Sequence, residues 1–129
     1  MATVRGVPGL TKLTAEDVFR LHPKIRFVGL ASKDGEVIFS QQRSGTKSFS
    51  PEEADRAFVQ MGPLILMGVC ERLSPWTGRV GSIVINYEKV SSLIMRVKDG
   101  YLAMTVEKAG AAETISEVVK SLRRLTDFA

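Results

Sequence analysis

The stretch IRFVGLASKDGEVIFSQQ, residues 25–42, decides the fold of this chain. Its two ends are rich in residues that favour strands, and the Asp34-Gly35 pair between them is a strong short-range hairpin signal. In the first strand, residues 25–32, Phe27 faces one way while Val28 and Leu30 face the other, so both faces carry apolar groups. We therefore expect an antiparallel hairpin within a sheet that helices cover on both sides.

Three more strands are predicted downstream, at residues 82–87, 90–97 and 101–107, and the last two are joined by a second Asp-Gly turn, Lys98-Asp99-Gly100. Ahead of the first hairpin, Thr14 caps a short predicted helix that Pro23 closes. After Gly110 a final amphipathic helix directs its apolar residues inward. The predicted class is α+β, of order αββαβββα, with a five-stranded antiparallel sheet and helices on both faces.

A longer helix is predicted between the first hairpin and the three-stranded meander. We expect Ser50 to be its N-cap and Pro51 its first helical residue. Gly62-Pro63 predicts a bend or a break within it, and Ser74-Pro75 predicts its end, followed by a loop at residues 76–81. Its apolar stripe has three- and four-residue spacing and consists of Ala54, Ala57, Phe58, Met61, Ile65 and Val69.

The composition is that of one globular domain. The chain of 129 residues is 44% hydrophobic and 25% charged, which predicts a real core and leaves no room for a second domain. We assign residues 1–129 to a single domain in which residues 1–12 form an irregular N-terminal arm. The one cysteine, Cys70, forms no internal disulfide and is interpreted as a buried core thiol. Without a signal peptide or a long apolar run, the sequence predicts a cytoplasmic protein with no membrane insertion.

No catalytic, cofactor-binding or metal site is predicted. His22 is the only histidine and has no cysteine or second histidine at metal-ligand spacing. The acidic pairs Glu16-Asp17 and Glu52-Glu53 fall in first helical turns, where carboxylates complement the helix dipole. Phosphate-loop, dinucleotide-binding and nucleophile-elbow motifs are missing. We therefore expect a protein that is not an enzyme and needs no cofactor.

Trp76, the only tryptophan, lies close to Arg79 in a predicted loop, and both residue types are common in binding hot spots. Two interpretations stay open for this tryptophan. The favoured one is a structural plug that caps the sheet, and the other is a contact with a partner.

The formal net charge of +4 raises the question of a polyanion site. Four basic residues are candidates to gather near one sheet face, together with Phe49 or Tyr87: Arg26, Arg43, Lys47 and Arg96. Scattered, solvated charges are the favoured interpretation, because basic residues are spread along the whole chain. Nucleic acid is therefore not expected as a partner.

The order of the predicted elements resembles the Roadblock and dynein light-chain-seven fold, with profilins and longin domains as neighbouring architectures. The likeness is carried by Asp34-Gly35 between the strand segments FVG (27–29) and VIF (37–39), and by residues 102–106 leading into the amphipathic helix at 115–125. It covers nearly the whole chain. The run HPKIRFVG, residues 22–29, followed by Gly35 also resembles a group of small archaeal proteins of unknown function.

This resemblance implies a non-enzymatic homodimer or heterodimer that acts as a scaffold or regulator for small GTPases or motor complexes. The implied partners are a second copy, a small GTPase, or another Roadblock or longin protein. In the family, middle helices and third strands pair across two chains, and these correspond here to residues 51–73 and 82–87. An open edge strand suits this role because a second chain satisfies its unpaired backbone groups. The expected interface residues are Phe58, Met61, Ile65, Val84 and Asn86, with Trp76 and Arg79 as a further partner contact.

Two other functions stay open. The chain is also similar to small-molecule-sensing domains, which place an antiparallel sheet between helices, and a deep apolar pocket between sheet and helix would favour that function. Nucleic-acid binding would require the basic residues to cluster. A filled core with an exposed third strand and middle helix would favour the interaction module.

Overall fold

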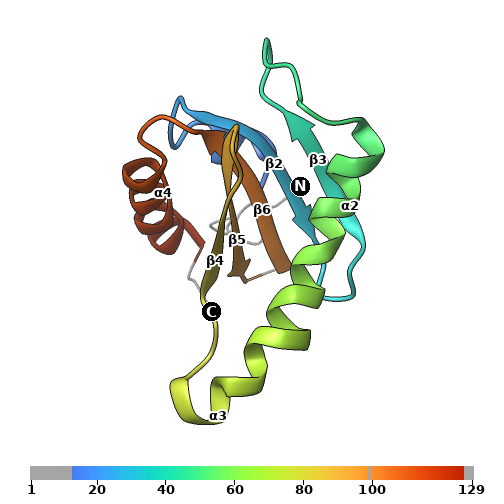
Figure 1. Ribbon diagram of the computed structural model, residues 1–129, viewed down its shortest axis with the longest axis vertical. Coiled ribbons are helices and arrows are strands. Elements are labelled where there is room, and N and C mark those ends of the chain that lie inside the picture. The colour runs from blue at the N-terminus through green and yellow to red at the C-terminus, as the bar shows by residue number, and fades with distance from the viewer. Residues whose placement is uncertain (1–12, 99, 127–129) are drawn as a thin grey trace, which may run out of the picture.

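The computed structural model describes residues 13–98 and 100–126 of the chain (Figure 1). Its elements are α1 (Ala15–Phe19), β2 (Ile25–Ala31), β3 (Val37–Gln42), α2 (Glu52–Pro63), α3 (Ser74–Thr77), β4 (Ser82–Asn86), β5 (Val90–Val97), β6 (Gly100–Glu107) and α4 (Ala111–Thr126). The predicted order is therefore confirmed, with an extra helical turn, α3, before the third strand. The predicted arm, residues 1–12, lies outside the described residues.

The strands form one antiparallel sheet in the order β3-β2-β6-β5-β4, which leaves β3 and β4 at its two edges. The hairpin at Asp34-Gly35 is confirmed, and Gly35 has a φ of 89°, a conformation that glycine adopts without strain. The second predicted hairpin is also confirmed, because Val97 of β5 pairs with Gly100 of β6. The first hairpin and the meander thus set the neighbours within each half of the sheet, and the pairing of β2 with β6 joins the two halves.

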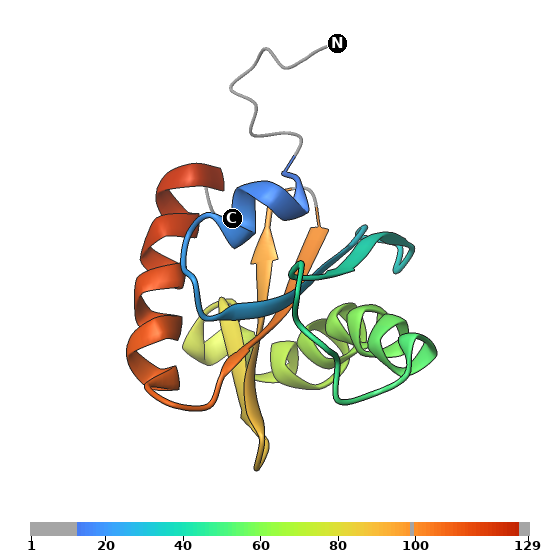
Figure 2. The same ribbon diagram turned by 90° about the horizontal axis from the view of Figure 1, so that it is seen from above.

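Helices cover both faces of this sheet, as predicted. Figure 2 shows α4 on one side of the strands and α2 on the other. The side chains that alternate along each strand accordingly divide between two cores. The first core joins α1 and α4 to the sheet and includes Val18, Phe19, Val28, Leu30, Leu93, Met95, Leu102, Met104, Val118 and Leu122. The second lies under α2 and includes Phe27, Ala31, Val59, Leu66, Ile94, Tyr101 and Ala103.

The N-caps of α1 and α2 differ, and only the first is as predicted. Thr14 caps α1 as predicted, in a capping box in which its hydroxyl accepts from the Asp17 N–H and the Asp17 carboxylate accepts from the Thr14 N–H. The prediction for α2 is wrong by one residue, because Pro51 itself is the N-cap, in extended conformation. The Ser50 hydroxyl instead donates to the Asp55 carboxylate, at 2.6 Å.

The helical run that begins with α2 continues beyond the predicted end. Gly62-Pro63 does interrupt its regular geometry, since a π-helical segment (Leu64–Val69) and a 3-10 turn (Cys70–Leu73) follow. This change of hydrogen-bonding pattern is expected where proline lacks an N–H. Ser74-Pro75 does not end the run, because proline is tolerated in the first turn of a new helix, and α3 begins there.

The side of the helical run that packs most closely on the sheet lies beside the predicted apolar stripe, and its buried residues are Val59, Gly62, Pro63 and Leu66. Within the stripe, Phe58 and Ile65 are half-buried against the same core, whereas Ala54, Ala57 and Met61 are exposed. Gly29 of β2 explains why this side fits so closely, because a Cβ there would lie 2.2 Å from a methyl group of Val59. The helix therefore rests directly on the backbone of β2.

No helix in the described part of the chain is both long enough and apolar enough to cross a membrane.

Candidate interaction surface

The outer edge of β4 carries backbone groups that no strand of the described chain satisfies. In its pairing with β5, the Tyr87 N–H donates to Val90 and the Arg96 N–H donates to Gly81. Antiparallel ladders alternate, so the odd-numbered residues of β4 bond to β5 and the even-numbered ones face outward. Ser82, Val84 and Asn86 therefore present their N–H and C=O groups at the open edge of the sheet.

Exposed and half-buried apolar groups accompany this edge. The Val84 side chain is 45% exposed, and Asn86 beside it is exposed as well. On the other face of the strand, Ile83 and Ile85 are only half-buried at the margin of the core under α2. An edge strand with two half-buried isoleucines on one face and an exposed valine on the other is suited to a protein–protein contact.

One flank of the helical run that begins with α2, beside its packed side, carries further partly exposed apolar groups. Met61 is 45% exposed, while Phe58 and Ile65 are half-buried at the margin of the same core as Ile83 and Ile85. At 3.6 residues per turn, these three residues lie along one flank of the helix. The five interface residues predicted from the sequence thus occupy β4 and one flank of α2, and we call this the β4–α2 surface.

Leu64 was not predicted as a surface residue, although it is 71% exposed. It lies three residues after Met61 and beside the turn of the β2–β3 hairpin at Lys33 and Asp34. No sequence signal separates it from Ile65, because the two differ only in helical phase.

Trp76 lies in α3 and is 80% exposed, so the prediction that it plugs the sheet is wrong. Figure 1 shows α3 at one extremity of the molecule, beyond the strands. Leu73 next to it is also exposed, and so are the side chains of Arg72 and Arg79. We call these four residues the α3 tip. Their combination of an indole, an aliphatic group and two guanidinium groups is typical of an interface hot spot.

The tip is fastened to the sheet by a partly buried ion pair. Glu71 accepts a hydrogen bond from Arg96 of β5, whose side chain is buried. This hydrogen bond holds the pKa of the Glu71 carboxyl below its ordinary value against the opposing effect of burial, with smaller contributions from the Ser74 side chain and the Val80 backbone. Because these groups flank α3, the carboxylate fixes where Trp76 is presented.

A cavity of about 560 Å³ opens at the other end of α2, between the start of the helix, the loop before it and the β4–β5 turn. Its apolar walls come from Phe27, Phe49, Ala54, Phe58 and Val90. Its polar groups are Arg26, Gln42, Ser48, Ser50, Asp55, Tyr87, Glu88, Lys89 and Thr105. Its size is that of a ligand or side-chain pocket.

The polar side of the cavity is largely self-satisfied. Asp55 accepts hydrogen bonds from Gln42, Ser48 and Ser50, at 3.2, 2.9 and 2.6 Å. Arg26 pairs with Glu107 at 3.0 Å and stacks 4.6 Å from the centre of the Phe49 ring. Its position next to Phe49 fits part of the predicted polyanion site, but its charge is already paired.

The structure does not gather the four basic residues proposed for that site. Arg43 donates to the backbone carbonyls of Phe19, His22 and Ile25, at 2.8, 2.7 and 2.6 Å. Arg96 is the partner of Glu71 near the α3 tip. Arg26 has both Arg43 and Lys47 as neighbours, because the Arg43 N–H donates to the Arg26 carbonyl and the Arg26 guanidinium donates to the Lys47 carbonyl. The guanidinium groups of Arg26, Arg43 and Arg96 are each engaged within the chain, so the four basic residues do not form one open cationic patch.

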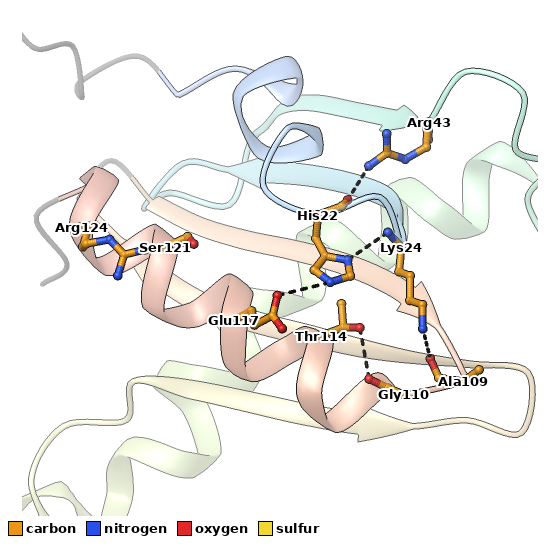
Figure 3. Close-up of polar contacts among 9 residues, drawn as sticks. All are labelled: His22, Lys24, Arg43, Ala109, Gly110, Thr114, Glu117, Ser121 and Arg124. Carbon is orange, nitrogen blue, oxygen red and sulfur yellow. Dashed lines mark hydrogen bonds and ion pairs between the residues drawn. The ribbon is translucent and has the colours of Figure 1, made fainter.

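His22 joins the turn after α1 to α4 (Figure 3). Its Nδ1 accepts from the Lys24 N–H at 3.1 Å, and its Nε2 lies 3.5 Å from the Glu117 carboxylate. The Lys24 ammonium reaches the Ala109 carbonyl at 3.1 Å, just before α4 begins. Within the described residues, no three His, Cys, Asp or Glu side chains come together as metal ligands. The predicted burial of Cys70 concerns a side chain that lies outside the described part of the structure.

No protein-family model matches the sequence, and no curated protein matches it either. Solved structures do resemble the fold. The gliding protein MglB from Thermus thermophilus aligns with a TM-score of 0.64 at 12% identity, over 96% of this chain and 94% of that one. An MglB structure with a tetrameric arrangement gives 0.64 at 14%, over 96% and 93%. A Roadblock/LC7 domain from Streptomyces avermitilis gives 0.59 at 16%, over 84% and 91%.

These likenesses establish the fold. The described chain has the α+β architecture of the Roadblock/LC7 domain, with its five-stranded antiparallel sheet between helices. This agrees with the resemblance seen in the sequence.

Proposed function

We propose that the chain is a non-enzymatic interaction module that works as a homodimer joined through the β4–α2 surface. The single observation that carries the proposal is the open edge of β4, where Ser82, Val84 and Asn86 present unpaired backbone groups beside exposed apolar side chains. Pairing with β4 of a second copy would satisfy these backbone groups and bury these apolar side chains at the same time.

A two-fold axis at Val84 gives the most complete pairing. Val84 then lies opposite Val84 of the second copy, and Ser82 lies opposite Asn86, so that every outward N–H and C=O group of β4 finds a partner. The same axis sets the two α2 helices antiparallel on one side of a continuous sheet. Met61 and the half-buried flank at Phe58 and Ile65 then come to lie toward the other copy's helix.

We further propose that this dimer is a scaffold or regulator of a small GTPase, or pairs with another Roadblock or longin protein. The support for this role is the likeness to MglB and MglC structures, together with the tetrameric arrangement that one MglB structure is named for. The cytoplasm is the proposed compartment.

Sedimentation velocity over a range of concentrations tests the dimer with matched variants. Met61→Asp places a charge on the β4–α2 surface and is expected to shift the chain to a monomer. Gln60→Asp places the same charge on the flank that faces the turn of the β2–β3 hairpin, where it is expected to leave the dimer intact.

The strand is tested separately. Val84→Pro removes an N–H that points away from β5, which an edge strand tolerates, and is expected to give a folded monomer. Val84→Thr keeps the N–H and the strand propensity, and is expected to dimerise. A wild-type monomer throughout the micromolar range, or equal effects of the two α2 variants, contradicts the proposal.

A further inference from the structure

The most exposed aromatic side chain of the described residues and the cavity of about 560 Å³ lie at opposite ends of one helical run. Trp76 is 80% exposed in α3, while Ala54 and Phe58 line the cavity near the start of α2. The stretch from Phe58 to Trp76 spans roughly 27 Å at a helical rise of about 1.5 Å per residue. Trp76 therefore does not reach the cavity of its own chain.

A second copy brings the two features together. Pairing of β4 around Val84 places Gly81 opposite Tyr87 of the second copy and Val80 opposite its Glu88. Tyr87, Glu88 and Lys89 form one wall of the cavity, and α3 ends three residues before Val80. The antiparallel arrangement of the two α2 helices has the same effect, because the helical run of one copy ends beside the start of α2 in the other. The α3 tip of each copy thus comes to the cavity of its partner.

The chemistry of tip and cavity is complementary. An indole is a large, flat group whose burial in an apolar pocket contributes strongly to binding. The apolar walls of the cavity include Phe27, Ala54, Phe58 and Val90. A volume of about 560 Å³ has room for the indole.

We propose that Trp76 of each copy inserts into the cavity of the other, so that the dimer has two identical tip-in-cavity contacts. The inference rests on the proposed dimer and adds the occupant of its pocket. A pocket that a second copy fills is an assembly site, and a small ligand in the same pocket would compete with assembly.

The only tryptophan of the chain reports directly on this contact. At concentrations where sedimentation shows a dimer, Trp76 emission is expected to be blue-shifted and shielded from acrylamide. On dilution to the monomer, or in Met61→Asp, the emission is expected to move to the red and quenching to increase. A dimer in which Trp76 stays as accessible to acrylamide as in the monomer overturns the inference and leaves the proposed dimer standing.

Two variants remove the contact from either side. Trp76→Ala empties the pocket and Ala54→Arg obstructs it, and each is expected to raise the dimer dissociation constant at least about tenfold, as the loss of a hot-spot contact does. Ala57→Arg is the matched control, because it adds the same group to an exposed position of α2 that does not line the cavity. Circular dichroism of each variant shows whether the fold is kept.

Mixing the variants separates this contact from a general loss of stability. A heterodimer of Trp76→Ala and Ala54→Arg chains contains one intact contact, whereas either homodimer contains none. The mixture is therefore expected to form heterodimers more tightly than either variant forms homodimers. Heterodimers that are no tighter than the homodimers overturn the inference, and so does a pocket that binds the dye anilinonaphthalene sulfonate equally in dimer and monomer. A wild-type monomer at all concentrations instead refutes the proposed function itself.

Discussion

The contact between Gly29 and Val59 is where α2 comes closest to the sheet, and a double-mutant cycle tests it. Gly29→Ala adds a methyl group whose carbon would lie 2.2 Å from the Val59 Cγ2 and 3.1 Å from its Cγ1, so the helix or the side chain has to move. Overpacking of this kind costs about 1–3 kcal/mol. The same movement displaces the flank of α2 that carries Met61.

Val59→Ala removes both of those methyl groups. Val59 is fully buried, so the loss of two buried carbons costs about 1.6 kcal/mol at roughly 0.8 kcal/mol each, and the cavity raises the cost to about 2–3 kcal/mol. In the double variant the new methyl of residue 29 occupies the space that Val59 has vacated. The double variant is therefore expected to be more stable than the sum of the two effects by about 1–2 kcal/mol.

Urea unfolding followed by far-ultraviolet circular dichroism gives the four free energies, at one protein concentration so that association contributes equally. Gly68→Ala is the control partner for Val59→Ala, because a Cβ at Gly68 meets nothing within 4 Å. Its cycle is expected to be additive. Additive effects for Gly29 and Val59 would refute the close packing of α2 on β2.

Three other perturbations have defined outcomes. In the folded chain the Glu71 pKa lies below its ordinary 4.5, so the stability that this carboxylate contributes is present above pH 4.5 and is lost as the pH falls through the lowered pKa. Acid unfolding of Glu71→Gln is expected to lack this pH-dependent contribution. An acid-unfolding profile identical to that of the wild type would contradict the role of the pair with Arg96. Arg43→Met leaves three backbone carbonyls without their charged donor and is expected to cost about 2–4 kcal/mol in urea unfolding, a loss below about 1 kcal/mol arguing against these bonds. Gly100→Ala places a Cβ 2.0 Å from the backbone oxygen of Ala31 and is expected to prevent folding. In Gly35→Ala the new Cβ meets nothing within 4 Å, so this variant is expected to lose only about 1 kcal/mol of stability in thermal unfolding. Equal effects of the two variants would contradict the pairing of β6 with β2.

The strands and both hairpins were predictable from the sequence because local signals set them, whereas the pairing of β2 with β6 joins distant segments that no local signal marks. Asp34-Gly35 lies between two runs of strand-forming residues, and a tight turn leaves those runs only one way to pair. The same holds for the turn that joins β5 to β6. Thr14 and Asp17 likewise form their capping box from neighbouring residues alone.

The packed side of α2 was not predictable, because it depends on a residue in another element. Gly62 and Pro63 add little to an apolar stripe, yet both are buried, since Gly29 lets the helix approach on that side. The stripe with Phe58 and Met61 is the more hydrophobic flank in the sequence, yet Phe58 and Ile65 are only half-buried and Met61 is exposed. A helix with two apolar flanks, of which one packs within the chain, is what an interface helix requires.

The cavity and the tip escaped prediction for a related reason. The cavity walls come from β2, the loop before α2 and the β4–β5 turn, and no short motif marks their meeting. Trp76 was interpreted as a plug because tryptophan is usually buried, and its exposure follows from the continuation of the helix through Ser74-Pro75.

Hydrogen exchange at the edge of β4 tests the dimer most directly, because it observes the backbone groups on which the proposal rests. The amides of Ser82, Val84 and Asn86 point away from β5, so they exchange rapidly in a monomer. At concentrations where the chain is dimeric, these three amides are expected to become protected and to lose that protection on dilution or in Met61→Asp. Rapid exchange at all three positions in a chain that sediments as a dimer would show that the copies do not pair through β4.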